Sequence, residues 1–134
     1  MNNKILQGYT ISRSVEYPFF IPTNIQSKLL RNYCKEKNFK YKLHLGEFNL
    51  KNSTIQLYQI INNSKNINGI LTCSITFLPN NLKKLIDLFK LIKSKKLEFH
   101  FIFDEIIFKN QNVKSFSISL LKELNKIKNE YNNR

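Results

Sequence analysis

Short apolar runs and amphipathic segments alternate along this chain, and the alternation predicts its architecture. Apolar side chains occupy every second position, or short continuous runs, in four segments that are typical of strands: 4–12, 39–45, 69–74 and 97–103. Segments with 3.6-residue apolar spacing predict helices, with stripes at 25–33, 57–61, 82–92 and 116–127. Because strands that alternate with helices favour βαβ crossovers, we expect a single three-layer α/β domain. Its sheet is expected to be mainly parallel, with four or five strands in flavodoxin-like or resolvase-like order.

Local signals predict where the helices begin and where the chain frays. Thr23 and Gln26 have the spacing of a capping box, in which the hydroxyl accepts a backbone amide and the glutamine reaches back. Ser53 and Gln56 repeat this spacing before the second helix. No repeat or linker divides residues 1–134, so one domain is expected, with a frayed tail from about residue 129.

Polar side chains directly follow all four strand patterns. In open parallel sheets, ligands bind outside the carboxyl ends of the strands, so these side chains are expected to outline one pocket. The set supplies hydroxyls, a thiol, one cation and carboxylates: Ser12, Arg13, Ser14, Glu47, Cys73, Ser74, Asp104 and Glu105. All of them except Ser14 are candidates for catalysis.

Arg13 is the most specific member of this set. It is one of three arginines in a lysine-rich chain, and a guanidinium beside two serines could hold a phosphate or carboxylate with its planar fork. A salt bridge to Glu47 or Asp104 uses the same geometry, so both alternatives stay open. Cys73 could be a nucleophile if Arg13 lowered its pKa, but packing at a buried strand end is favoured.

The remaining polar residues allow some chemistries and exclude others. Glu47, Asp104 and Glu105 could act as acid and base, or they could be solvated strand ends. His44 and His100 are expected to project from their strands opposite their apolar neighbours, where His100 could reach a cleft. The sequence has no Gly-x-Ser-x-Gly, Gly-rich phosphate loop, Cys-x-x-Cys or His-x-x-x-His. A Ser-His-Asp triad, a metal and a dinucleotide cofactor are therefore not expected.

Composition limits the binding partners and the cellular compartment that we expect for this protein. The net charge is +13, but only three of the 22 basic residues are arginines and the lysines are dispersed. This is typical of drift in an AT-rich genome rather than of nucleic-acid binding. No apolar run approaches the roughly 20 residues that cross a bilayer, and the N-terminus does not resemble a signal peptide. With only Cys34 and Cys73, we expect a cytoplasmic protein with reduced, buried thiols.

A series of short motifs resembles one family. The motifs are Gly8-Tyr9, Ser12-Arg13, Ile21-Pro22, Gln26, Leu30-Arg31, Tyr33-Cys34, Gly69-Ile70, Cys73-Ser74, Leu78-Pro79 and His100-Phe101. In order and spacing they resemble the sporadic carbohydrate cluster proteins, which are small bacterial proteins encoded among genes for lipopolysaccharide and other surface-polysaccharide synthesis. The resemblance implies a pathway and not a reaction. Phe19-Phe20 stand where that family carries a glycine and a basic residue; if that basic residue helps to bind an anion, this protein is expected to bind its ligand differently or less well.

The strand ends and these motifs together give the candidate ligand-binding residues: Tyr9, Ser12, Arg13, Ser14, Gln26, Ser74 and His100. A fainter resemblance, in element order, is to the catalytic domain of serine recombinases. Ile11 replaces the arginine that follows the Gly-Tyr pair there, and the segment 74–77 lacks the arginine of its Asp-Arg pair. This resemblance implies a shared fold and not recombination chemistry.

Three functions are compatible with these observations, in decreasing order of support. The first is binding of a sugar phosphate or nucleotide-linked sugar at the strand tips, in surface-polysaccharide biosynthesis, with catalysis left open. The second is a non-enzymatic partner or regulator of a glycosyl-transfer enzyme, indicated by the missing catalytic signatures and the aromatic loop at 17–21. The third is recombinase-like DNA binding. A homodimer through the helix at 116–127 is an alternative to packing of that helix within the protein.

Overall fold

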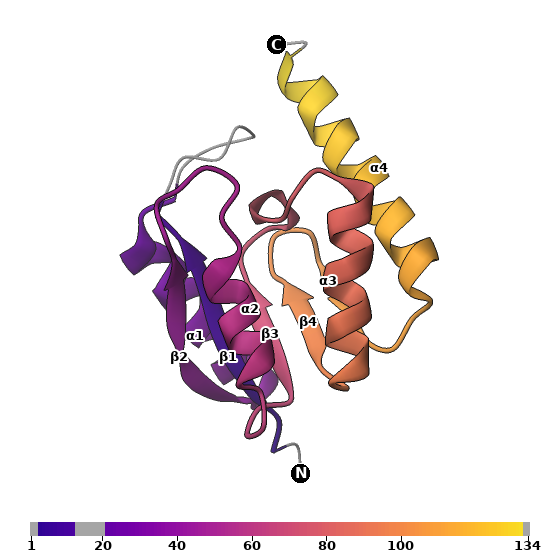
Figure 1. The fold of residues 1–134 in the computed structure, drawn as a ribbon. Coiled ribbons are helices and arrows are strands. Elements are labelled where there is room, and N and C mark those ends of the chain that lie inside the picture. Colours follow the sequence, from indigo (N-terminus) through magenta and orange to yellow (C-terminus); the bar gives the residue numbers. More distant parts are fainter. Residues whose placement is uncertain (1–2, 13–20, 133–134) are drawn as a thin grey trace.

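Helices lie on both faces of a five-stranded sheet in the computed structural model, which describes residues 3–12 and 21–132 (Figure 1). The strands are β1 (Ile5–Ile11), β2 (Lys40–Glu47), β3 (Gly69–Thr72), β4 (Glu98–Phe101) and β5 (Ile106–Phe108). The helices are α1 (Thr23–Lys37), α2 (Ile55–Asn62), α3 (Leu82–Ser94) and α4 (Val113–Asn132), with a 3-10 turn η1 (Ile75–Phe77). The predicted α/β fold class is confirmed. α4 is helical through residue 132, which includes part of the tail expected to fray.

The strand order is β2-β1-β3-β4-β5. Every neighbouring pair is parallel except β4 and β5, which are antiparallel. The order reverses at β1, because the chain passes from β1 to β2 on one side and then returns to place β3 on the other. The carboxyl ends of β1 and β3 therefore flank the position at which open α/β sheets form a ligand-binding crevice.

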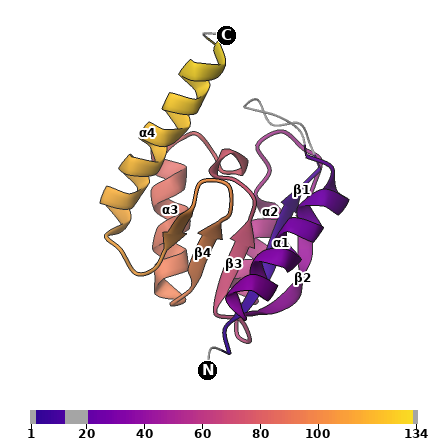
Figure 2. The same cartoon turned by 180° about the vertical axis from the view of Figure 1, so that it is seen from behind.

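Each face of the sheet has its own hydrophobic core. Figure 1 shows α2 and α3 in front of one face with α4 beside α3, and Figure 2 shows α1 on the opposite face, in front of β1 and β2. The first core contains a cluster of aromatic rings from α3, β4, β5 and α4: Phe89, Phe99, Phe108 and Phe116. The second core is smaller and gathers Leu30 of α1 with Leu6 and Leu71 of the sheet.

The apolar stripe of α4 packs within the protein. Leu120 and Leu124 are buried in the first core, and Phe116, Leu121 and Ile127 are partly buried against it. α4 lies mainly along α3 and also touches η1, and its last turns extend beyond the rest of the structure (Figures 1 and 2). None of the described helices is both long and apolar enough to cross a membrane.

Neither predicted capping box forms. α1 begins with Pro22 in the cap position and has no side-chain cap, because Gln26 bonds to the backbone of Ile11 and Ile21 instead. At α2, the first amides donate to the Glu47 carboxylate, and Ser53 Oγ donates to the same group. A carboxylate accepts backbone amides more strongly than a hydroxyl does, so it takes the place that Ser53 was expected to fill.

Gly8 permits the closest approach of neighbouring side chains to β1. A Cβ at Gly8 would lie 2.6 Å from Tyr41 Oη, 2.8 Å from His44 Cβ and 2.9 Å from Leu30 Cδ1. At Gly46 of β2, a Cβ would lie 3.3 Å from Thr10 Oγ1. The absence of a side chain at position 8 therefore lets Leu30 of α1 and the Tyr41 and His44 side chains of β2 pack directly against β1.

We expect Gly8→Ala to lower the free energy of unfolding by about 1–3 kcal/mol, the cost of overpacking a core. Gly46→Ala is the matched control and should cost clearly less, because a shift of a few tenths of an ångström accommodates its methyl group. Urea unfolding of both variants measures the difference. Equal losses would contradict the close approach at Gly8.

Candidate functional site

Serine side chains follow the two strands that flank the crevice. Ser12 comes directly after β1 and is exposed. Ser74 comes after β3 and is buried, with its Oγ accepting from the Thr76 amide at 3.1 Å. Below the crevice, Thr72 Oγ1 donates to the Tyr9 carbonyl at 2.8 Å and ties the two strands together. Arg13, Ser14 and the aromatic loop as far as residue 20 lie outside the described residues.

Gln26 joins the end of β1 to the residues that precede α1. Its Oε1 accepts from the Ile11 amide at 3.1 Å, and its Nε2 donates to the carbonyls of Ile11 and Ile21, both at 2.7 Å. The side chain is only 1% exposed. Both of its N–H groups are used by the backbone, so Gln26 positions the two segments rather than presenting donors to a ligand.

Glu47 holds the N-terminus of α2. Its buried carboxylate accepts five hydrogen bonds, from Tyr9 Oη, Ser53 Oγ and the amides of Phe48, Gln56 and Leu57. Burial alone would raise the pKa of Glu47, but these hydrogen bonds lower it below its ordinary value. Glu47 is therefore ionised at neutral pH, and its oxygens already accept hydrogen bonds from the protein. Tyr9 is buried and donates to Glu47.

Of the other candidates at this edge, Asp104 has a local partner, Cys73 is buried and Glu105 is exposed. Asp104 Oδ2 accepts from the Ile75 amide at 2.7 Å, which connects the turn after β4 to η1, and burial raises the Asp104 pKa. Glu105 is exposed and has a positive φ of 53°. Cys34 and Cys73 are free, buried thiols. Burial raises the pKa of Cys73 to about 12, which leaves it protonated and poorly nucleophilic at neutral pH.

The structure therefore brings only some of the predicted residues together. Ser74 and Asp104 meet at η1, while Glu47 lies at the junction of β2 and α2. His100 lies within β4 and not at the strand tips. At this edge Glu47, Ser74 and Asp104 accept hydrogen bonds from backbone amides at the starts of α2 and η1.

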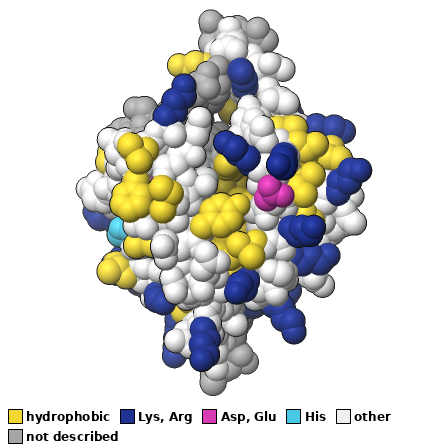
Figure 3. Space-filling model, in the orientation of Figure 1, with side chains coloured by type: hydrophobic (Ala, Val, Ile, Leu, Met, Phe, Trp, Pro, Cys, Tyr) yellow, Lys and Arg dark blue, Asp and Glu magenta, His cyan; other side chains and the backbone are white. Residues whose placement is uncertain are grey.

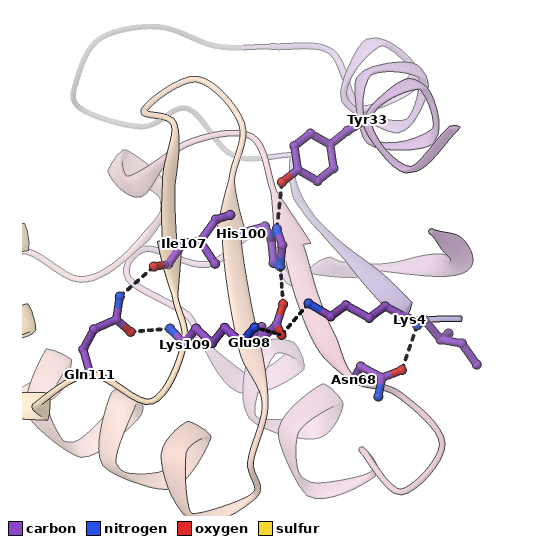
Figure 4. Close-up of polar contacts among 9 residues, drawn as sticks. Lys4, Tyr33, Asn68, Glu98, His100, Ile107, Lys109 and Gln111 are labelled. Carbon is purple, nitrogen blue, oxygen red and sulfur yellow. Dashed lines mark hydrogen bonds and ion pairs between the residues drawn. The ribbon is translucent and has the colours of Figure 1, made fainter. Parts of the chain in front are cut away.

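A hydrogen-bonded chain lies on the α1 side of β4 (Figure 4). Tyr33 Oη is 2.7 Å from His100 Nδ1, and His100 Nε2 is 2.8 Å from Glu98 Oε1. The other oxygen of Glu98 is 2.9 Å from Lys4 Nζ and 3.9 Å from Lys109 Nζ. Strand alternation places Glu98 and His100 on one face of β4, as was predicted for His100.

The charge states of His100 and Glu98 fix the direction of the hydrogen bonds between Tyr33, His100 and Glu98. Burial lowers the pKa of His100, although the bond to Glu98 opposes the shift, so the ring is neutral at pH 7. Burial alone would raise the pKa of Glu98, but Lys4 and His100 lower it, so Glu98 is ionised. A carboxylate can only accept, so Nε2 carries the imidazole proton and Nδ1 accepts the Tyr33 hydroxyl. Burial raises the pKa of Tyr33, and Cys34 and Glu98 add to the shift.

Sequence reasoning missed Tyr33 and Glu98 as functional candidates. Glu98 and His100 are two positions apart in a strand, which places them on the same face and could have marked them as a pair. Tyr33 is 67 residues from His100, and no local pattern joins them. In a second tyrosine–histidine pair, Tyr41 Oη lies 3.3 Å from His44 Nδ1.

The described residues offer no ready metal site. Among residues 3–12 and 21–132, no three His, Cys, Asp or Glu side chains gather in a metal-binding group. A shallow groove of about 260 Å³ lies between β2 and α2, away from the crevice and from His100, and is lined by Gln7, Lys42, Leu45, Gln56, Gln59, Ile60 and Asn63.

The strand order and the helices around the sheet define a resolvase-like fold. The protein is similar to the N-terminal catalytic domain of TP901-1 integrase, with a TM-score of 0.67 and 16% identity over 95% of this chain and 98% of that one. It is also similar to a resolvase family site-specific recombinase from Streptococcus pneumoniae, with a TM-score of 0.62 and 12% identity over 93% and 89%. The sequence matches no family model and no curated protein. At these identities the likeness shows the fold alone.

We expect Glu47→Gln to lower the free energy of unfolding by at least about 2 kcal/mol, because hydrogen bonds to a charged group are lost and donors are left unpaired. Glu105→Gln, at an exposed position, is the control and should change stability little. Urea unfolding compares the two variants. A Glu47→Gln protein as stable as the parent would contradict the structural role of this carboxylate.

Stability should also depend on pH through His100. Its folded pKa lies below the ordinary 6.5, so the unfolded chain binds a proton that the folded protein excludes. The stabilisation is complete above about pH 6.5 and is lost as the pH falls through the folded pKa. Glu47 and Glu98, with pKa values below 4.5, add a second loss at lower pH. Urea unfolding between about pH 8 and pH 4 should show the first loss in the parent protein and not in His100→Gln.

Proposed function

We propose that this protein binds a sugar phosphate or nucleotide-linked sugar in the crevice between the carboxyl ends of β1 and β3, in bacterial surface-polysaccharide biosynthesis. The strand order is the observation that carries the proposal. In this order, Ser12 follows β1 and Cys73-Ser74 follow β3, the two strands on either side of the switch point. These are also residues that resemble the sporadic carbohydrate cluster proteins.

The chemistry around the crevice supports an anionic ligand. The exposed Ser12 provides a hydroxyl, and Arg13 provides a guanidinium in the adjoining sequence. The nearby carboxylates of Glu47 and Asp104 accept hydrogen bonds from the protein's own amides, which reduces their repulsion of an anion. The protein as a whole carries a net charge of +13, and Figure 3 shows lysine and arginine side chains dispersed over the face drawn there.

Exposed aromatic rings could contact the apolar parts of such a ligand. Phe48 follows β2 and is 47% exposed, and Phe103 follows β4 and is 43% exposed. Ligand sites commonly combine apolar and aromatic surface with a few placed polar groups. The proposal concerns binding, and DNA strand chemistry is not part of it, because the likeness to recombinases is one of fold.

A thermal-shift panel of sugar phosphates, nucleotide sugars and inorganic phosphate tests the proposal. A ligand present at 100 times its dissociation constant should add about 2.7 kcal/mol to the free energy of unfolding. Arg13→Ala should abolish most of this gain, because it removes the group expected to hold the phosphate. Arg31→Ala is the matched control, since Arg31 lies on α1 with its guanidinium 5.1 Å from the Tyr41 ring. The absence of a shift with every sugar, or equal shifts in parent and Arg13→Ala, would contradict the proposal.

A further inference from the structure

Tyr33, His100 and Glu98 have the arrangement that an activated nucleophile requires. The hydroxyl lies within hydrogen-bond reach of a base, and a third group orients that base. We propose that these three residues form a catalytic triad in which the Tyr33 oxygen attacks the phosphorus of a phosphate ester. This activity goes beyond the binding proposed for the β1–β3 crevice and does not depend on it.

The geometry of His100 suits it to the role of the base. The ring is 2% exposed and is enclosed edge-on by Tyr33 and Phe39, with ring centroids 5.7 and 5.9 Å away. It is neutral at pH 7, and its unprotonated Nδ1 faces the hydroxyl. Glu98 holds the opposite nitrogen and stabilises the imidazolium that forms when the ring takes a proton.

The position of Tyr33 leaves a direction from which a substrate can approach. Tyr33 is half-buried at the side of α1 that faces β4, and its hydroxyl points to His100 (Figure 4). α1 covers β1 and β2, and no described helix lies in front of β4 on this side of the sheet (Figure 2). Because His100 and Glu98 are buried and Tyr33 is partly exposed, a ligand approaches the triad at the Tyr33 side chain.

The charges around the triad favour a phosphate ester over a neutral ester. Lys37 Nζ lies 5.8 Å from the centroid of the Tyr33 ring. Lys4 and Lys109 both approach Glu98, so the one carboxylate of the triad faces two ammonium groups. An anionic phosphoryl group is attracted to such surroundings, whereas a neutral acyl ester gains nothing from them.

The proposed step is a phosphoryl transfer to tyrosine followed by hydrolysis. The Tyr33 oxygen forms a bond to phosphorus as its proton passes to His100 Nδ1. The bond between phosphorus and the ester oxygen breaks, and the alcohol leaves with the electron pair and takes the proton from the imidazolium. Water then attacks phosphotyrosine while His100 accepts a proton from the water. That proton returns to the Tyr33 oxygen, and inorganic phosphate is released.

The Tyr41–His44 pair provides a control within the same protein. Its oxygen and Nδ1 are 3.3 Å apart, against 2.7 Å in the triad. No carboxylate of the described residues is bonded to His44. If a tyrosine beside a histidine were sufficient for reactivity, both pairs would react. The proposal requires that only Tyr33 does.

Covalent trapping with an alkyl fluorophosphonate tests the nucleophile directly. The probe forms the same bond between Tyr33 oxygen and phosphorus and releases fluoride, and peptide mass spectrometry locates the adduct. Tyr33 should be modified faster than Tyr41, and His100→Gln should slow the reaction on the order of 100-fold or more. Tyr33→Phe should remove the adduct, and Tyr41→Phe should leave it unchanged. Urea unfolding verifies that the variants are folded.

Turnover of p-nitrophenyl phosphate, compared with p-nitrophenyl acetate, tests the substrate class. Hydrolysis of the phosphate that is lost in Tyr33→Phe and kept in Tyr41→Phe supports the proposal. In Glu98→Gln, the acid limb of the pH–rate profile should move to lower pH, because Glu98 raises the pKa of His100. A purely structural Glu98 would leave that limb in place.

Three results would overturn the triad: labelling of Tyr33 no faster than of Tyr41, labelling unaffected by His100→Gln, or phosphate hydrolysis that survives Tyr33→Phe. Turnover of the acetate without the phosphate would overturn the assigned substrate class. The outcome is separable from that of the crevice, because the adduct is located by mass spectrometry on Tyr33 itself, whereas the crevice is tested by the loss of the thermal shift in Arg13→Ala.

Discussion

A parallel sheet has to be covered on both faces, and the cover is uneven here. α2, α3 and α4 serve one face, while α1 lies over β1 and β2 on the other. Beyond α1, the second face of β4 is closed by side chains, with the rings of Tyr33 and Phe39 around His100. Polar groups can fill this position because each is hydrogen-bonded, whereas an unpaired buried group would cost about 1–3 kcal/mol. The need to cover this face therefore shapes the second core and places the buried, hydrogen-bonded side chains of Glu98 and His100 on β4.

The carboxyl edge of the sheet is governed by a different requirement. Loops that leave strand ends carry backbone amides without partners, and buried amides have to be satisfied. Glu47 and Asp104 bind such amides at α2 and η1, and Gln26 binds both sides of the junction before α1. A polar residue at a strand tip can therefore either bind the protein's own backbone amides or face a ligand, and the sequence does not distinguish the two roles. Ser12, which is exposed, remains available on the crevice side of β1.

The sequence predicted the order of the elements because periodicity and short connections depend on local chemistry. It failed at the starts of α1 and α2, where the cap expected from Gln26 and Ser53 was replaced by contacts with distant backbone and with Glu47. The Tyr33–His100 contact could not be predicted for the same reason, since it joins residues 67 positions apart. The alternation of β4 already placed Glu98 and His100 together, so two of the three triad residues were present in the pattern.

The two tyrosine–histidine pairs show what the fold adds to residue identity. His44 lies where the register of β1 and β2 shifts, and the residue two positions earlier is Lys42, whose ammonium group cannot accept a hydrogen bond from the imidazole. His100 lies in a regular stretch of β4, where the residue two positions earlier faces the same side and is Glu98. A carboxylate behind the imidazole fixes its tautomer and stabilises its protonated form, which a tyrosine and histidine alone do not achieve. The carboxylate two positions before His100 therefore separates a candidate acid–base system from a contact between the same two residue types without one.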